Sequence, residues 1–390
     1  MTQEFVTPRL RQFGTTIFAE MSALATQLGA VNLGQGFPDT DGPRRVLDAA
    51  VRAIESGVNQ YPPGPGMKVL RDAIARHQDR FYGVAYDPEA EVLVTAGATE
   101  ALAGAILGIL EEGDEVIVFE PMYDSYQACL ALAGATTVPV LLEPPDYRPD
   151  FEVLRAAITP RTRVLLVNSP HNPTGMMLTD DEQEELIRIA EEHDLIVISD
   201  EVYEHLVFDG KRHRSLAAVP GARKRTIVVS SGGKTFNTTG WKIGWAVGPA
   251  ALIAAVRAAK QFLTYVNGAP FQPAIAEGLD LDDEYFIGIA KELQARRDQL
   301  VPALSDAGFE VFPSASTYFV TVDVRPLQED GDGMAFCHRL AHEAGVVAIP
   351  NVVFYTPQHR DRGRHLVRFA FCKQEHVIAD AAHRLRSWAS

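Results

Sequence analysis

A lysine set among small residues is the position in this sequence best suited to covalent chemistry. Lys234 follows Gly232 and Gly233, which come shortly after the apolar run 226–229. An amine attacks a carbonyl group only when its pKa is lowered, and a pocket edge with a second cation nearby, such as Lys242, lowers it. The two glycines leave room for a flat molecule. We therefore expect Lys234 to form a Schiff base with a flat cofactor.

A carboxylate at the end of an apolar run is the second candidate. Asp200 directly follows the run 195–199. A buried carboxylate is costly unless a cation pairs with it, and a protonated pyridine nitrogen is a suitable partner. Taken alone, Asp200 is better explained as a helix cap or a member of a buried ion pair. The presence of Lys234 favours the catalytic interpretation.

A candidate phosphate site lies where a strand passes into a helix. Gly97, Ala98 and Thr99 follow the predicted strand 92–95 and open a predicted helix. Backbone N–H groups at a helix start bind anions, and small residues permit a close approach. A plain turn with a helix cap is the more frequent explanation of such a segment. Ser231 and Lys242 strengthen the phosphate interpretation, because they would add a hydroxyl group and a cation.

Three more side chains could contact an aromatic cofactor. Asn172 and Tyr203 could donate hydrogen bonds to a phenolate oxygen, and Tyr123 could stack on a ring. The simpler alternatives are a turn at the Asn-Pro dipeptide and ordinary aromatic packing. His171 and His205 are interpreted as loop or core histidines, because no partner at ligand spacing accompanies them. We therefore predict no metal site.

An arginine lies inside a segment with alternating apolar residues. Arg368 needs a planar anionic partner in such a strand, and an amino-acid α-carboxylate bound in a fork geometry would serve. An internal salt bridge is an equally good explanation from the sequence. Tyr61 lies in the Pro- and Gly-rich segment 59–66, which by itself indicates only a rigid loop.

The elements that must position these residues are buried strands alternating with amphipathic helices. The strands are predicted at 115–119, 163–167, 195–199, 226–229 and 245–247. Such an alternation predicts an α/β fold with a mainly parallel sheet. Thr179 and Glu182 form a capping-box pattern that predicts a helix start. Because ligands of such sheets gather at the carboxyl ends of the strands, the segments 168–175, 200–203 and 230–234 should converge.

The chain is expected to form two domains. We predict a large domain over residues 45–280 and a smaller α+β domain built from 1–44 and 281–390. The Gly- and Pro-rich stretch 32–39 cannot be a regular helix, and the pattern changes near residue 280 to a long polar helix over 284–300. Short strands follow it at 317–322 and 366–371.

Composition excludes several classes of partner. The 390 residues carry a formal net charge of -15, which would repel nucleic acids and anionic membrane surfaces. No secretory signal or membrane-spanning run is evident. The 3 cysteines show neither disulfide nor zinc spacing. We expect a soluble protein of the reducing cytoplasm, without nucleic-acid or membrane partners.

Taken in order, these segments resemble the fold-type I pyridoxal-phosphate enzymes, specifically the class I/II aminotransferases. The order of the motifs is far more specific than any one of them, and the resemblance covers nearly the whole chain. The matching segments are 32–38, 59–61, 97–100, 168–175, 200–203, 231–234, 240–245 and 367–369.

The resemblance implies a role for each residue that would face pyridoxal 5'-phosphate. Lys234 would carry the cofactor, Asp200 would keep its pyridine nitrogen protonated, and Tyr123 would stack on the ring. Asn172 and Tyr203 would bind the phenolate oxygen. The catalytic residues would therefore be Lys234, Asp200 and Tyr203.

The resemblance also implies how the phosphate and the substrate are held. Residues expected at the phosphate are Ala98, Thr99, Ser231 and Lys242. Tyr61 would reach in from the second subunit of a homodimer. Residues expected at the substrate carboxylate are Gly36, Asn172 and Arg368. The substrates would be an amino acid and a 2-oxo acid.

Within the family, the segments 34–39 and 240–245 resemble the branch of kynurenine, methionine and actinobacterial N-succinyldiaminopimelate aminotransferases. The segments 18–25 and 256–261 look most like the last group. Its reaction, in lysine biosynthesis with 2-oxoglutarate and glutamate as the second pair, is the expected function. Val352 departs from the serine usual in this branch, which bears on side-chain specificity. A kynurenine, methionine or aromatic aminotransferase, a carbon-sulfur β-lyase and a non-catalytic regulator are the alternatives.

Overall fold

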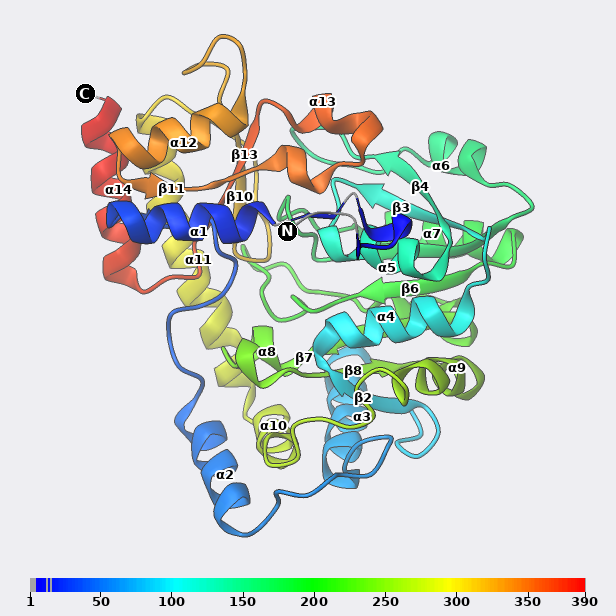
Figure 1. Ribbon diagram of the computed structural model, residues 1–390. Helices are drawn as coiled ribbons and strands as arrows, with labels where there is room; N and C mark the ends of the chain where they lie inside the picture. Colours follow the sequence, from blue (N-terminus) through cyan, green and yellow to red (C-terminus); the bar gives the residue numbers. More distant parts are fainter. Residues whose placement is uncertain (1–4, 12, 15, 390) are drawn as a thin grey trace.

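A seven-stranded sheet forms the centre of the molecule (Figure 1). The computed structural model describes residues 5–11, 13–14 and 16–389. Within this part, the strand order is β2-β8-β7-β6-β5-β3-β4. The strands are β2 (Val92–Ala96), β3 (Glu115–Glu120), β4 (Thr136–Leu141), β5 (Thr162–Asn168), β6 (Ile196–Asp200), β7 (Thr226–Ser231) and β8 (Ile243–Val247).

The predicted mainly parallel sheet is confirmed. β3 to β7 are parallel to one another, whereas β8 runs antiparallel to both β7 and β2. The sequence analysis missed β4, which forms the edge of the sheet. Its residues are mostly half-buried and include Pro139, which an edge strand tolerates because its missing N–H can face away from the ladder.

Helices cover both faces of this sheet, which explains the continuous apolar runs of its strands. In β3, Val116 and Val118 pack with α4, α5 and α9, whereas Ile117 and Phe119 pack with α6 and α7. The helices of this part are α2 (Arg44–Glu55), α3 (Lys68–Tyr82), α4 (Gly97–Ile109), α5 (Asp124–Ala133), α6 (Phe151–Ala157), α7 (Asp180–Glu192), α8 (Gly232–Thr235), α9 (Ala250–Lys260) and α10 (Phe271–Leu279). The predicted capping box of α7 is present, with Thr179 and Glu182 as its members.

A second layer of structure joins the two ends of the chain. A four-stranded antiparallel sheet has the order β12-β13-β10-β9, and β1 pairs with β11 in parallel. These strands are β1 (Val31–Asn32), β9 (Glu310–Val311), β10 (Phe319–Asp323), β11 (Val346–Val347), β12 (Ile349–Pro350) and β13 (Leu366–Ala370). The helices are α1 (Ile17–Leu28), α11 (Asp283–Asp306), α12 (Gly333–Glu343), α13 (Arg360–Gly363) and α14 (Glu375–Ala389).

Contacts of α1 with α12 and of α11 with α14 place the first and last helices together at one side of the molecule (Figure 1). The long helix predicted over 284–300 is confirmed, as part of α11 (Asp283–Asp306). The division into domains at residues 45 and 280 stays a prediction. Among the described residues, no helix is long and apolar enough to cross a membrane.

Candidate active site

A cavity of about 320 Å³ opens at the carboxyl ends of β5, β6 and β7. Because these strands are parallel, their last residues lie side by side, and Asn168 is paired with Asp200 in the ladder. The predicted site residues that line the cavity are Gly36, Ala98, Thr99, Tyr123, Asn172, Asp200, Tyr203, Ser231, Lys234, Lys242 and Arg368. The three segments expected to converge do so here.

Lys234 lies on the short helix α8 directly after β7. Its Nζ donates a hydrogen bond to the Tyr318 hydroxyl at 2.9 Å, and that hydroxyl donates to the Gly36 carbonyl oxygen at 2.6 Å. The pKa of Lys234 is lowered to about 8, chiefly by burial and in smaller part by Arg368 and Lys242, against the opposing effects of Cys372 and Asp200. The expected influence of Lys242 is present, but burial is the main cause. A large fraction of neutral, nucleophilic amine follows near pH 8.

Asp200 ends β6 and is almost fully buried. Its Oδ2 accepts a hydrogen bond of 2.6 Å from the Tyr126 hydroxyl, and its Oδ1 accepts from the Val202 N–H at 3.3 Å. No lysine or arginine of the described chain forms an ion pair with it. Burial raises the pKa of Asp200 to about 6, although Tyr126 and Lys234 act in the opposite direction. The carboxylate therefore remains able to pair with a cation placed in the cavity.

The start of α4 forms a narrow cradle beside Lys242. Gly97 has a φ of +74°, and a Cβ atom there would lie 3.0 Å from the Lys242 Nζ. A Cβ on Gly244 would lie 2.4 Å from the Gly97 carbonyl carbon. The Lys242 Nζ is 3.5 Å from the Thr99 Oγ1. Together with the first N–H groups of α4, these atoms present donors to an anion in one small space.

Arg368 lies in the middle of β13 with only 2% of its surface exposed. Its guanidinium donates to the Asn172 Oδ1 at 2.9 Å and to the Gly34 carbonyl oxygen at 3.2 Å, and lies 3.9 Å from the centre of the Phe319 ring. Its Nε has no hydrogen-bond partner. The salt bridge considered from the sequence is absent from the described chain. A buried guanidinium with an unused donor is suited to bind a carboxylate.

The other three residues expected to face an aromatic cofactor, Tyr123, Asn172 and Tyr203, also line the cavity. Asn168 accepts a hydrogen bond from the Asn172 N–H at 2.8 Å and so fixes the loop after β5. The Asn172 amide oxygen is occupied by Arg368, so its NH2 group is the donor left for another partner. Burial raises the pKa of Tyr123 to about 12 and that of Tyr203 still further, so both hydroxyls stay protonated donors.

Tyr61 is the one predicted cofactor contact that the structure does not bring to this cavity. Its side chain is 83% exposed and packs edge-to-face on Tyr265, with ring centres 5.6 Å apart. The prediction placed it in the site of a second subunit, and it stays a prediction.

Two tyrosines at the site were missed from the sequence. Tyr126 supports Asp200, and Tyr318 contacts Lys234. Tyr126 lies three positions after Tyr123, one helical turn further along α5, which is the signal that could have found it. Tyr318 offered no such signal, because its partners Gly36 and Lys234 are distant in the sequence.

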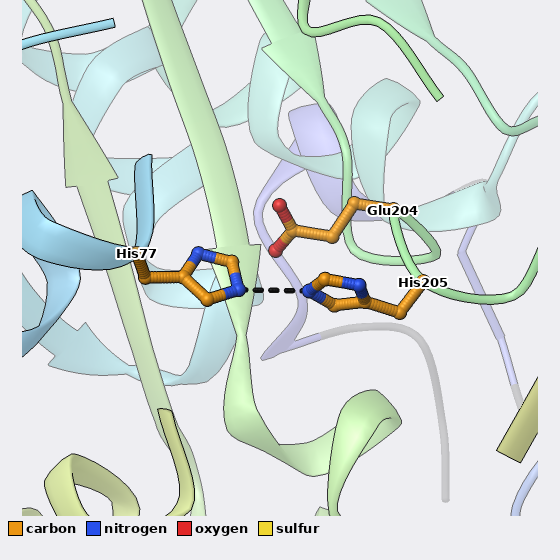
Figure 2. Close-up of side chains that lie close together, drawn as sticks. All are labelled: His77, Glu204 and His205. Atoms are coloured by element: carbon orange, nitrogen blue, oxygen red, sulfur yellow. Dashed lines mark hydrogen bonds between the residues drawn. The ribbon is translucent and has the colours of Figure 1, made fainter. Parts of the chain in front are cut away.

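The two histidines interpreted as loop or core residues both have a hydrogen-bond partner. His171 is a satisfied core residue, because its Nδ1 lies 2.7 Å from the Thr174 Oγ1. The partner of His205 is a second histidine, and the expected absence of a metal site stays a prediction. The His205 Nε2 lies 2.7 Å from the Nε2 of His77, beside Glu204 (Figure 2). The fold brings α3 against the loop after β6, which sequence spacing does not reveal.

A second cavity of about 830 Å³ adjoins the first. Phe18, Tyr123 and Asp124 line both, so they form the boundary between them. Arg360 and Arg364 lie among the residues around the second cavity, as does Val352. An elongated molecule held at Arg368 would extend past Phe18 into this space.

Comparison with known proteins decides the family. The sequence profile described as aminotransferase class I and II matches residues 29–385. The chain belongs to the class I and II aminotransferases. It is therefore an enzyme that acts on an amino acid and a 2-oxo acid, as its family does.

Individual relatives match this chain over nearly its full length. The N-succinyldiaminopimelate aminotransferase DapC of Mycobacterium tuberculosis is 55% identical over 97% of both chains. Its solved structure has a TM-score of 0.94 over 97% of this aminotransferase and 99% of that chain. The methionine aminotransferase of Escherichia coli is 42% identical, again over 97% of both chains. The fold is accordingly that of the fold-type I aminotransferases.

Proposed function

We propose that this aminotransferase uses pyridoxal 5'-phosphate held by Lys234, Asp200 and the cradle at the start of α4. The observation that carries the proposal is the set of unpaired charges around Lys234. Asp200 is buried without a cation, and the Arg368 Nε is buried without a partner. The donor set fits the cofactor, because a phosphate, a pyridinium nitrogen and a substrate carboxylate would each meet a group of opposite charge.

When bound, the cofactor supplies an aldehyde for the amine and a ring that withdraws electrons from the substrate Cα. Asp200 would hold the ring nitrogen in its protonated, charged form. Arg368 and the NH2 group of Asn172 would orient the substrate carboxylate. Lys234 would act as the acid/base group for the Cα proton.

We infer that the amino donor is N-succinyl-LL-2,6-diaminopimelate, with the 2-oxoglutarate/glutamate pair as the other substrate, in lysine biosynthesis. The 55% identity to the mycobacterial enzyme supports this. The second cavity supports it too, because its size suits a long side chain and Arg360 and Arg364 could meet distal carboxylates. In the described chain, Arg364 has an acidic neighbour, Asp332, at 3.7 Å, whereas no ion pair involves Arg360.

A methionine or aromatic amino acid is the second candidate. Phe18 and Phe319 line the first cavity and would form an apolar wall. The 42% identity to the methionine aminotransferase of Escherichia coli points the same way. Both donors would share Arg368 for the α-carboxylate, so they differ only in what lies beyond Phe18.

A panel of amino donors tests the two assignments. Wild-type enzyme is mixed with each donor without a 2-oxo acid, and the loss of the aldehyde form is followed by absorbance. We expect the highest kcat/KM for N-succinyl-LL-2,6-diaminopimelate and ping-pong kinetics with 2-oxoglutarate. Lys234→Ala should show no turnover. A preference for methionine or kynurenine would reject the first donor, and pyruvate release from cystathionine without an acceptor would indicate the β-lyase.

We also propose a homodimer in which Tyr61 contacts the cofactor phosphate of the partner subunit. Tyr61, Phe262 and Tyr265 are 83%, 84% and 53% exposed. The Lys260 ammonium links this region by donating to the carbonyl oxygens of Gly64 and Tyr265. A second copy covering these rings would remove them from water. The cytoplasmic location expected from the cysteines stays a prediction.

A further inference from the structure

Two histidines and a glutamate that have no role in the active site lie close together beside β7. His77 comes from α3, whereas Glu204 and His205 come from the loop after β6. The ligand-type atoms of the three side chains all lie within 4.8 Å of one another. Figure 2 shows the Glu204 carboxylate pointing toward the gap between the two rings. Two ring nitrogens and a carboxylate oxygen therefore face a common point.

The Glu204 carboxylate is incompletely satisfied within the chain. Its Oε1 accepts a hydrogen bond of 2.5 Å from the Ser230 hydroxyl, while its Oε2 has no partner of regular geometry. The Tyr82 hydroxyl lies close enough to lower the pKa of Glu204 and is a neighbouring donor in a poor geometry. Glu204 is 3% exposed. A buried carboxylate oxygen with only a poorly placed donor is costly, and it can bind a cation in exchange.

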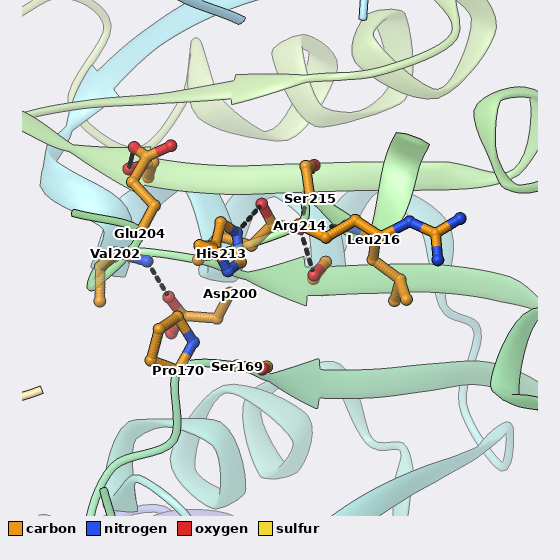
Figure 3. Close-up of polar contacts among 12 residues, drawn as sticks. Ser169, Pro170, Asp200, Val202, Glu204, His213, Arg214, Ser215 and Leu216 are labelled. Atoms are coloured by element: carbon orange, nitrogen blue, oxygen red, sulfur yellow. Dashed lines mark hydrogen bonds and ion pairs between the residues drawn. The ribbon is translucent and has the colours of Figure 1, made fainter. Parts of the chain in front are cut away.

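The charge around this cluster is not balanced by lysine or arginine. Glu201 lies close enough to raise the pKa of Glu204, and its own contacts are with His213 at 2.9 Å, with Ser199 and Ser215, and with the Leu216 N–H. Figure 3 shows Glu204 and His213 in this part of the molecule. Neither carboxylate forms an ion pair with a lysine or arginine among the described residues. Arg80 lies close enough to His77 to lower its pKa, and it is paired with Asp283. The two buried acids thus lie among imidazole and hydroxyl groups.

His77 also borders the protein surface. A surface hollow of about 300 Å³ between α3 and the end of α10 is lined by Arg76, His77, Asp79, Arg80 and Asp280. Asp280 is paired with Arg76 at 2.6 Å, so the hollow carries charges of both signs. Because His77 is only 2% exposed, an ion would enter the cluster during a local opening of α3.

We propose that His77, His205 and Glu204 bind one divalent transition-metal ion of the zinc type. Two neutral imidazoles and one carboxylate are the ligand types that Zn²⁺ prefers, and they leave a fourth position for water. Binding replaces the contact between the two histidines, which move apart so that each Nε2 presents its lone pair to the ion. Because Glu204 also accepts from Ser230, the ion joins α3 to the strand that carries Lys234 into the site.

The test is zinc binding to the cofactor-loaded enzyme. Wild type, His77→Gln, Glu204→Gln and His383→Gln are stripped with a chelator and dialysed against buffered Zn²⁺. Metal content is then measured by elemental analysis and thermal unfolding is recorded. His383 is an exposed residue of α14 and serves as the matched control. Cofactor content and circular dichroism show which variants are folded.

We expect one equivalent of zinc per chain and a raised melting temperature in wild type and His383→Gln. Affinity should fall at least about 100-fold in His77→Gln and in Glu204→Gln, since each loses a direct ligand. Should His77→Gln fail to fold, Glu204→Gln decides alone. Less than one equivalent in wild type, or equal affinity in a folded ligand variant, overturns the proposal.

Discussion

Asp200 and Arg368 are both buried, and neither forms an ion pair with another described residue. On the surface, by contrast, ion pairs between arginines and acidic residues are frequent, as at Arg188 and Glu185. Around Lys234, the charged groups are oriented without being neutralised: Asp200 accepts a hydrogen bond from Tyr126, Arg368 donates one to Asn172, and Lys234 donates one to Tyr318. Single residues of this site are therefore expected to affect stability and catalysis in opposite directions.

Asp200→Asn should stabilise the cofactor-free protein while abolishing most activity. Because the folded-state pKa of Asp200 is raised to about 6, ionisation of its carboxyl group opposes folding. The free energy of unfolding of wild type should match the variant below about pH 4 and fall behind it through pH 6, by roughly 1–3 kcal/mol at pH 7.5. Urea unfolding at the two pH values measures this. The variant's kcat should fall by more than about 100-fold; equal pH profiles of stability would contradict the prediction.

Tyr318→Phe should lower kcat by about tenfold with little change in KM for the amino donor, because it frees the Lys234 amine without touching the substrate carboxylate. Tyr285→Phe is the matched control. That hydroxyl donates to the Thr235 carbonyl oxygen at 2.8 Å on the same short helix but does not contact Lys234. The control should lose about 1 kcal/mol of stability and keep its kcat. Equal kcat values in both variants would show that Tyr318 has no positioning role.

Among the secondary-structure elements, the turn from β2 into α4 packs closely against the start of β8. A Cβ on Gly244 would overlap backbone atoms of Gly97 and Ala98, and a Cβ on Gly97 would meet the Lys242 side chain. Lys242 has a φ of +53° directly before β8, which directs the chain back along β7. The close approach of two backbones is thus what brings Lys242 beside the first turn of α4.

Gly244→Ala should reduce cofactor affinity at least about tenfold, because the new methyl group displaces Gly97 and Ala98 from the phosphate cradle. Gly240→Ala is its control, since a Cβ at that position has no atom within 4 Å. Titration of the cofactor-free variants by absorbance measures both affinities. If the two alanines behave alike, the cradle does not bind the phosphate.

Elements also show what the sequence could and could not predict. The strand ends at Asn168, Asp200 and Ser231 were predictable, because buried runs followed by polar residues mark carboxyl ends of parallel strands. β4 could not be predicted in this way, because a half-buried edge strand that contains Pro139 lacks a continuous run of buried apolar residues. The contact of His77 with His205 and of Tyr318 with Lys234 depends on packing between distant segments, for which a single sequence carries no local signal.

For the whole molecule, the exposed rings of Phe262, Tyr265 and Tyr61 mark the surface that a second copy should cover. Phe262→Asp should shift the enzyme toward monomer in sedimentation velocity and lower activity in proportion, because a charge would be buried at the contact. Ile287→Asp, at a 52% exposed position of α11 outside this surface, is the control and should leave the oligomer unchanged. A wild-type protein that sediments as a monomer at high concentration would reject the dimer.

Phe18, Tyr123 and Asp124 form the boundary between the two cavities. This boundary separates the residues expected to carry out the reaction from those expected to contact the substrate side chain. Residues on the inner side include those that end or follow the strands of the large sheet and would carry out the reaction common to all substrates. The outer cavity is lined by the first helix, residues of α5 and the segment 352–364. Exchange of the segment 352–364 between related enzymes should therefore change which amino acids are accepted, while the absorbance expected of the proposed cofactor is retained. Substrate selectivity in this fold can therefore change through substitutions that leave the catalytic residues untouched.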